Sequence, residues 1–211
     1  AGRQFGCLIV REGQVYIIGE RADFGMDTES AFRKCVAEEA GFRYEDTVIL
    51  VQRSDASAYQ FWVPGGSMGI GNSTPQLVLA ARELKKKILN CAVQPRQGMM
   101  MMMPMPGGNR PFFPGKQAED LDIRDGWVFE KANPSNRKPV KEIANAFWGS
   151  DPAVVHPVAP GASGMTLGGK PHPGMYIMSR QAHFLEAEVD TETGEVLVTR
   201  VVCVNDVGHL F

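Results

Sequence analysis

The sequence lacks a broad positive charge and long apolar runs. Its 22 Lys and Arg residues are outnumbered by 24 Asp and Glu residues, which gives a net charge of −2 and a pI near 6.1. Without a basic field the chain has nothing to attract a phosphate backbone, so nucleic acid is not expected as a partner. No stretch approaches the roughly twenty apolar residues of a membrane span. We therefore expect no membrane span.

The sequence also lacks clustered metal ligands. Its four cysteines lie far apart and form no C-x-x-C pair, which excludes a zinc knuckle, a thioredoxin-like motif and an iron–sulfur cluster held by this chain. Its four histidines show no i,i+4 spacing of a helical zinc site, so ordinary hydrogen-bonded histidines are favoured. Unpaired thiols are typical of a reducing compartment. We expect the protein to be cytoplasmic.

What is present is the composition of an ordinary globular domain, with 44% hydrophobic and 22% charged residues among 211. Apolar runs at 5–10 and 14–19, joined by a glycine-containing turn, predict a β-hairpin. Apolar residues at three- and four-residue spacing over 28–40 predict a helix that Asp27 or Thr28 caps and that ends at Gly41. These elements indicate an α+β fold of mixed sheets with packed helices.

The pattern continues with a β-branched strand over residues 47–52 and a glycine- and serine-rich loop. A second helix is predicted from Pro75, which suits a first helical turn, to Asn90. Residues 94–115 break the periodicity with methionines, prolines and glycines, and predict a loop or crossover. The methionine run at 99–105 can bind copper(I) through thioethers or pack adaptably against a partner, and packing is the favoured interpretation.

In the last third, a strand is predicted over residues 127–131 and a helix over 139–147. The chain then enters a long hairpin, because apolar and polar residues alternate on both sides of a turn at 190–194. We therefore divide the chain into residues 1–93 as a first subdomain with hairpin, helix, strand and helix, 94–125 as a Met/Pro/Gly-rich crossover, and 126–211 as a second subdomain that ends in the long hairpin.

Two loops are candidate sites because each enters a helix. The first spans residues 23–30 and the second spans residues 64–75. Unpaired backbone N–H groups at a helix N-terminus attract anions, and glycines admit a ligand close to the backbone. Either loop can equally be a simple capping loop. In the first loop, Asp27 and Glu29 already complement the positive end of the helix dipole.

The order of these motifs resembles a known family. Residues 22–30, 35–48, 66–74, 80–89 and the hairpin at 183–208 are similar, in this order, to the molybdopterin-binding large subunit of the molybdenum hydroxylase (xanthine dehydrogenase / aldehyde oxidase) family. The match covers about half of the chain. It implies the molybdenum-cofactor-binding domain fold of that family, as part of a domain.

The resemblance also implies where the cofactor is held. In the family both loops contact molybdopterin, in bacteria commonly as the cytosine dinucleotide. The corresponding residues here are Phe24, Gly25, Met26, Ser67, Met68, Gly69 and Ile70. Where the family has a glutamine in the first loop, this chain has Met26, which replaces an amide by a thioether. That change leaves two interpretations open, a different way of holding the cofactor and a loss of catalysis.

The implied reaction is hydroxylation of an aldehyde or N-heterocyclic carbon with oxygen from water. Electrons would pass to [2Fe–2S] and FAD on partner chains, so the expected partners are another molybdenum-subunit segment, an iron–sulfur subunit, an FAD subunit and a small-molecule substrate. The catalytic glutamate of the family lies beyond residues 205–208 and is expected outside this chain. The alternatives are a non-catalytic structural subunit that completes the molybdenum site of another chain, and a free-standing domain that binds an anionic small molecule.

Overall fold

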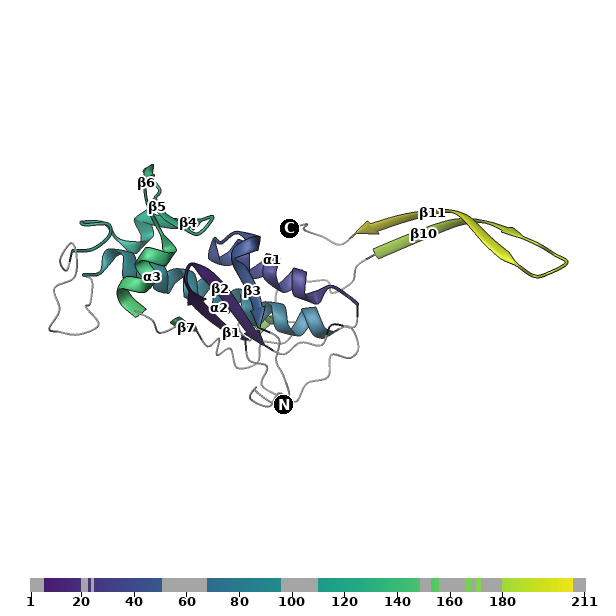
Figure 1. The fold of residues 1–211 in the computed structure, drawn as a ribbon, viewed down its shortest axis with the longest axis horizontal. Coiled ribbons are helices and arrows are strands. Elements are labelled where there is room, and N and C mark those ends of the chain that lie inside the picture. Colours follow the sequence, from purple (N-terminus) through teal and green to yellow (C-terminus); the bar gives the residue numbers. More distant parts are fainter. Residues whose placement is uncertain are drawn as a thin grey trace. The chain divides into compact units, whose positions relative to one another are not determined.

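The computed structural model describes residues 6–19, 23, 25–50, 68–95, 110–148, 153–155, 166–167, 170–171 and 180–206. These residues form helices and mixed sheets, so the predicted α+β class is confirmed (Figure 1). The chain divides into two compact units, Ala1–Pro173 and Gly174–Phe211. The three-part division at residues 93 and 125 stays a prediction.

The larger unit begins with the predicted hairpin. Strands β1 (Gly6–Arg11) and β2 (Gln14–Gly19) pair antiparallel. Their two-residue turn has positive φ at both Glu12 (53°) and Gly13 (85°), the conformation that matches the twist of a tight hairpin. Strand β3 (Thr47–Leu50) adds parallel to β2, and β7 (Ala153–Val155) adds antiparallel to β1. The sheet order is β3-β2-β1-β7.

Helix α1 (Thr28–Ala40) ends as predicted, at Gly41 with φ of 80°. The N–H of Gly41 donates to the carbonyl of Ala37 at 2.9 Å, which closes the last turn. A Cβ atom on Gly41 would lie 2.3 Å from the backbone oxygen of Ile123. Only glycine therefore lets the end of α1 approach strand β4 (Leu121–Arg124) this closely. A 3₁₀ turn, η1 (Tyr44–Asp46), then leads into β3.

Helix α2 (Met68–Val93) is longer than predicted at both ends. The predicted start at Pro75 and end at Asn90 are wrong. Glycine and serine favoured a loop over residues 68–74, but intrinsic propensity is a weak prior, and the helix anchored by buried residues from Leu77 to Ala92 continues through them. Pro75 lies inside the helix, where it cannot donate a backbone hydrogen bond.

A second sheet of three antiparallel strands follows, β4, β5 (Trp127–Glu130) and β6 (Asn133–Pro139) in this order. The prediction of β5 is confirmed, whereas β4, β6 and the 3₁₀ turn η2 (Ala118–Asp120) were not predicted. Strand β6 carries two prolines and no apolar alternation. Among the described residues it is an edge strand, where proline is tolerated because one side of the strand has no hydrogen-bonding partner strand. Helix α3 (Val140–Trp148) confirms the last predicted helix.

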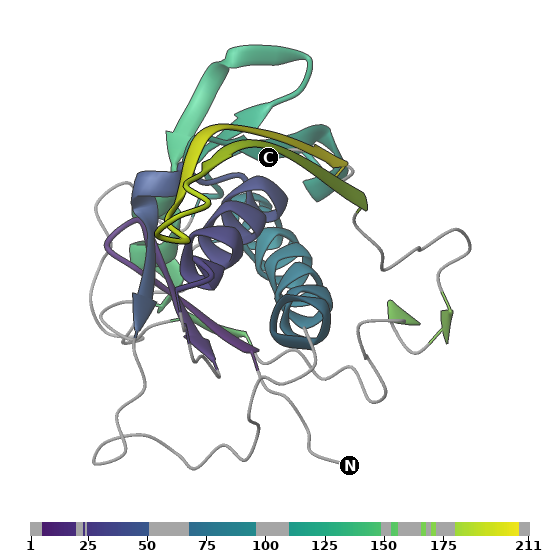
Figure 2. The ribbon, with the colours of Figure 1, turned by 90° about the vertical axis from the view of Figure 1, so that its right-hand side faces the viewer.

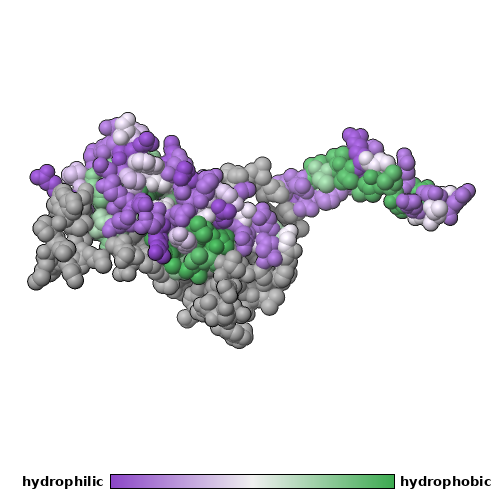
Figure 3. All heavy atoms as spheres, viewed as in Figure 1, coloured by the Kyte–Doolittle hydropathy of each residue, from purple (hydrophilic) through white to green (hydrophobic). Residues whose placement is uncertain are grey.

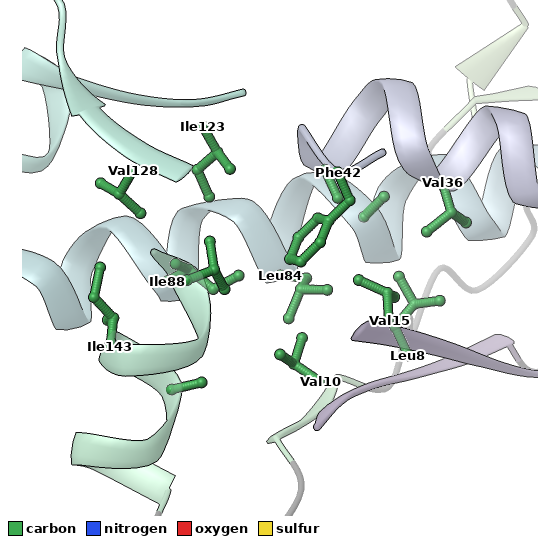
Figure 4. Packing of buried hydrophobic residues seen from close by; sticks show 14 of the residues in the cluster. Leu8, Val10, Val15, Val36, Phe42, Leu84, Ile88, Ile123, Val128 and Ile143 are labelled. Carbon is green, nitrogen blue, oxygen red and sulfur yellow. The ribbon is translucent and has the colours of Figure 1, made fainter. Parts of the chain in front are cut away.

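One core joins these elements. Leu8 and Val10 of β1 and Val15 of β2 face helix α2, where Leu84 and Ile88 are fully buried (Figure 4). The same cluster continues to α1, the second sheet and α3. Its members from those elements include Val36, Ile123, Val128 and Ile143, and Phe42, just after α1, belongs to the cluster as well. The larger unit thus provides its own hydrophobic core.

The smaller unit is the predicted long hairpin, β10 (Arg180–Val189) and β11 (Val196–Asp206). Gly194 in its turn has φ of 77°, as expected. Two further strands of two residues, β8 (Thr166–Leu167) and β9 (Lys170–Pro171), pair with each other in the larger unit. Every described residue of the long hairpin is exposed. Figure 3 shows hydrophobic side chains along it.

Candidate functional site

The first candidate loop is organised by Asp23. Its carboxylate accepts the backbone N–H groups of Gly25 and Met26, both at 2.8 Å, and that of Thr28 at 2.7 Å. It also accepts the Thr28 hydroxyl at 3.0 Å. Hydrogen bonds to the charged form, from the Met26 amide first, lower the pKa of Asp23 to about 2. Asp23 is therefore ionised at neutral pH and fixes the loop that enters α1.

This arrangement corrects two predictions. Asp27 occupies the N-cap position with φ of 55°, yet its side chain makes no cap hydrogen bond, and Thr28 donates rather than caps. The capping carboxylate comes from Asp23, outside the helix. The amides of Gly25, Met26 and Thr28, expected to be unpaired donors, are already used. Spacing along the sequence could not tell which of several carboxylates folds back, although an Asp two residues before a glycine is a common turn signal.

The loop nevertheless has an open side. Gly25 has φ of 94°, and among the described residues a Cβ atom built on it meets nothing within 4 Å. Met26 is 53% exposed. The loop can therefore receive a ligand against the Gly25 backbone and the Met26 thioether, with its amide donors turned to Asp23. Phe24 lies outside the described residues.

The second candidate loop is in part helical. Met68, Gly69 and Ile70 form the first turn of α2, so the prediction that the loop extends to Pro75 is wrong. Backbone N–H groups in a first turn have no partner within the helix, and the positive end of the dipole lies there. Ile70 is 42% exposed. Ser67, with the rest of the loop before α2, lies outside the described residues.

The fold brings the two candidate segments to one end of the larger unit. Helices α1 and α2 lie side by side and start at the same end, as both ribbon views show (Figures 1 and 2). The Arg82 guanidinium of α2 donates to the Glu39 carboxylate of α1 at 2.8 and 3.0 Å, which links the two helices at the surface. The assignment of the seven residues to a cofactor stays a prediction.

Three of the four cysteines are buried or half-buried. Burial raises the pKa of Cys35 to about 11 and also raises the pKa of Cys7 and of Cys91. Such thiols stay protonated at neutral pH and are poor nucleophiles and ligands. In the part of the chain that the structure describes, no three His, Cys, Asp or Glu residues come close enough to hold a metal ion. No helix among those residues has the length and apolarity to cross a membrane.

Comparison with known proteins gives a family and a fold. The family model for the molybdopterin cofactor-binding domain matches residues 7–211. A comparison with curated protein sequences gives no match. Among solved structures, quinoline 2-oxidoreductase from Pseudomonas putida 86 is similar with a TM-score of 0.62 and 18% identity, over 99% of this chain and 24% of that one.

Two structures of carbon monoxide dehydrogenase are similar as well. The Cu,Mo enzyme in its carbon monoxide reduced state has a TM-score of 0.58 and 18% identity. The reconstituted enzyme from Oligotropha carboxidovorans has a TM-score of 0.59 and 17% identity. Each match covers 96% of this chain and 22% of the other, so the chain spans about a quarter of the length of these solved chains. With a family model that matches nearly the whole chain, this protein belongs to the molybdopterin cofactor-binding domains, and the resemblance to molybdenum hydroxylases is confirmed.

Proposed function

We propose that this chain is the part of a molybdenum-binding subunit that holds molybdopterin at the N-terminal ends of α1 and α2. The family match supports this proposal, and so does the side-by-side start of the two helices. When bound, the cofactor supplies oxygen-atom and electron transfer. The reaction we propose is hydroxylation of an aldehyde or N-heterocyclic carbon with water oxygen, in the cytoplasm.

The two loops fit different parts of such a cofactor. The first turn of α2 offers backbone N–H groups at Met68, Gly69 and Ile70, which suit anionic phosphate oxygens, here assigned to the cytosine dinucleotide form. The first loop can contact the cofactor through its open surface but not through backbone N–H donors. The Gly25 and Met26 N–H groups already donate to the Asp23 carboxylate. It would contact an uncharged part of the cofactor. Phe24 and Ser67 complete the proposed set.

The remaining chemistry is assigned to other protein segments. The electron acceptors, [2Fe–2S] and FAD, and the catalytic glutamate are proposed on partner chains or on another molybdenum-subunit segment. A specific observation favours the second candidate function, a non-catalytic subunit that completes the molybdenum site of another chain. Met26 is 53% exposed on the open side of the first loop and offers a thioether where the family has a glutamine amide.

Metal analysis of the purified assembly that contains this chain tests the proposal. We expect molybdenum in stoichiometric amount, and its absence from every such assembly would refute cofactor binding. Gly25→Val should lower the occupancy, since it fills the open side of the loop. Gly115→Val is the matched control, because Gly115 also has positive φ (72°) and no described neighbour within 4 Å of its Cβ position. Equal occupancy in both variants would contradict the assignment of the first loop.

A second measurement separates the two candidate functions. An assembly that contains molybdenum and oxidises aldehydes or N-heterocycles supports the catalytic one. If molybdenum is present without turnover, Met26→Gln tests whether the thioether is the cause. Turnover gained in this variant identifies Met26 as the block, while continued inactivity favours the structural subunit.

A further inference from the structure

The solvent face of the second sheet carries arginines and aromatic rings. Leu121, Ile123 and Val128 face the core. The alternate residues form the other face, where Arg124 pairs with Trp127 across β4 and β5, and Phe129 pairs with Arg137 across β5 and β6. This sheet lies in the larger unit (Figure 1). We call these four residues the arginine–aromatic face.

Each arginine lies over the ring diagonal to it rather than the ring directly opposite. The guanidinium carbon of Arg137 is 4.8 Å from the ring centre of Trp127, and that of Arg124 is 5.6 Å from the ring centre of Phe129. Cation–π contacts of this kind hold a guanidinium in place without using its N–H donors. With Pro134 and Asp125, the four side chains line a pocket of about 150 Å³.

The donors of these two guanidiniums are not neutralised by the part of the protein that the structure describes. There, the exposed arginines Arg43 and Arg82 each form a two-pronged ion pair, with Asp46 and Glu39. Among the same residues neither Arg124 nor Arg137 has an ion pair. Asp125 lines the pocket and its charge acts on Arg43. The pocket therefore presents two guanidinium groups held by cation–π contacts, with the Asp125 carboxylate nearby.

The size of the pocket limits its occupant. Small-molecule sites usually measure about 300–1,000 Å³, well above this volume, whereas one side chain fits. Arginine forks match carboxylate geometry, and Trp and Arg are enriched where protein partners bind most tightly. Trp127 is 39% exposed and offers apolar area next to the forks. The net charge of −2 gives no support to a nucleic-acid partner.

We propose that the arginine–aromatic face docks a partner protein through an acidic side chain, Glu or Asp, which enters between Arg124 and Arg137 while its neighbours pack on Trp127. This surface is separate from the helix ends proposed for molybdopterin. A negative result for either proposal would therefore leave the other unaffected.

The test follows the indole N–H signal of Trp127 by two-dimensional NMR of the full ¹⁵N-labelled chain, assigned with Trp127→Phe. The probes are acetylated, amidated tetrapeptides in which Glu is flanked in turn by Gly, Leu and Phe, their Gln counterparts, and inorganic phosphate. We expect a saturable shift with Glu peptides, with affinity roughly tenfold higher than for the Gln peptides, the scale of one charge-assisted contact. Equal binding of Glu and Gln peptides, or no shift with any Glu peptide, would overturn the proposal.

Variants locate the effect. Arg137→Gln and Arg124→Gln should each weaken Glu-peptide binding roughly tenfold, and Arg137→Lys should weaken it less, because the charge stays while the fork is lost. Arg11→Gln, which removes an exposed arginine of the first hairpin, should change nothing and controls for net charge. Full binding in Arg137→Gln contradicts the docking geometry. If phosphate shifts the Trp127 signal as strongly as the Glu peptides, the pocket is a small-anion site and docking of a protein is refuted.

Discussion

The first hairpin and the last hairpin are both antiparallel strand pairs with a positive-φ glycine in the turn, and they differ in burial. In β1 and β2, Leu8, Val10 and Val15 are at most 2% exposed, because helix α2 covers that face. In β10 and β11 every described residue is exposed, including Phe184 at 63% and Leu185 at 61%. Strand-forming residues on both sides of a turn are thus enough to make a strand pair. Burial depends on another layer, and an isolated two-stranded hairpin is marginally stable in water.

The last hairpin also contains a bulge that gathers its apolar residues. Glu186 pairs with Arg200 while Ala187 pairs with Val198, so β11 has one extra residue there. Because of this shift, the side chain of Val198 lies on the same face of the hairpin as those of Leu185 and Val201. Without the extra residue it would lie on the opposite face. Contiguous exposed apolar patches mark interaction sites.

The largest expected effect comes from the covered region. Leu84 is fully buried beneath the first hairpin, in contact with a core that spans both sheets (Figure 4). Leu84→Ala should lower the free energy of unfolding by about 3 kcal/mol, through lost apolar burial and the cavity left behind. Urea unfolding followed by tryptophan fluorescence measures this, since all three tryptophans lie in the larger unit. A loss of less than about 0.5 kcal/mol in the free energy of unfolding would show that the core is not tightly packed.

A somewhat smaller loss is expected at the junction of α1 with the second sheet. Gly41→Ala should cost about 2 kcal/mol, since it combines an unfavourable φ of 80° with a Cβ atom 2.3 Å from the Ile123 oxygen. Gly115→Ala is the matched control, because its φ is 72° and no described residue lies within 4 Å of its Cβ position, so only about 1 kcal/mol of backbone strain is expected. Equal losses in the two variants would contradict the close approach of α1 to β4.

The loop that enters α1 should respond to pH. The pKa of Asp23 is lowered from 3.8 to about 2, so its contribution to stability is fully present above about pH 4 and is lost as the pH falls through 2. Asp23→Asn should lower the thermal midpoint at neutral pH, and the difference from the wild type should shrink as the pH approaches 2. Asp27→Asn, whose side chain makes no cap bond, should leave the midpoint unchanged. A larger effect at Asp27 would reverse the assignment of the cap.

The sequence predicted elements whose signal is local. The two hairpins, α1 and its end at Gly41, β5 and α3 all follow from periodicity and turn chemistry, and the order of motifs identified the family. The start of α2 and the edge strand β6 could not be predicted, because tertiary packing and edge position override a composition of glycine, serine and proline.

At the candidate site, a different factor limited what could be predicted from the sequence. The two loops were found because glycines precede helices, whereas the role of Asp23 depends on which carboxylate folds back onto the amides of Gly25 and Met26. The pairing of Arg124 and Arg137 with aromatic rings likewise requires the register of three strands, two of which had no sequence signal.

The smallest expected effect lies in the exposed hairpin. Leu185→Ser and Val201→Ser change side chains that are 61% and 53% exposed, so each should alter the unfolding of the larger unit by no more than about 0.5 kcal/mol. The tryptophan-monitored urea transition of the full chain measures this, and Leu84→Ala provides the positive control. A loss above about 1 kcal/mol would mean that the hairpin unfolds cooperatively with the covered core. The two hairpins would then differ in burial, while both would contribute to the free energy of unfolding of the larger unit.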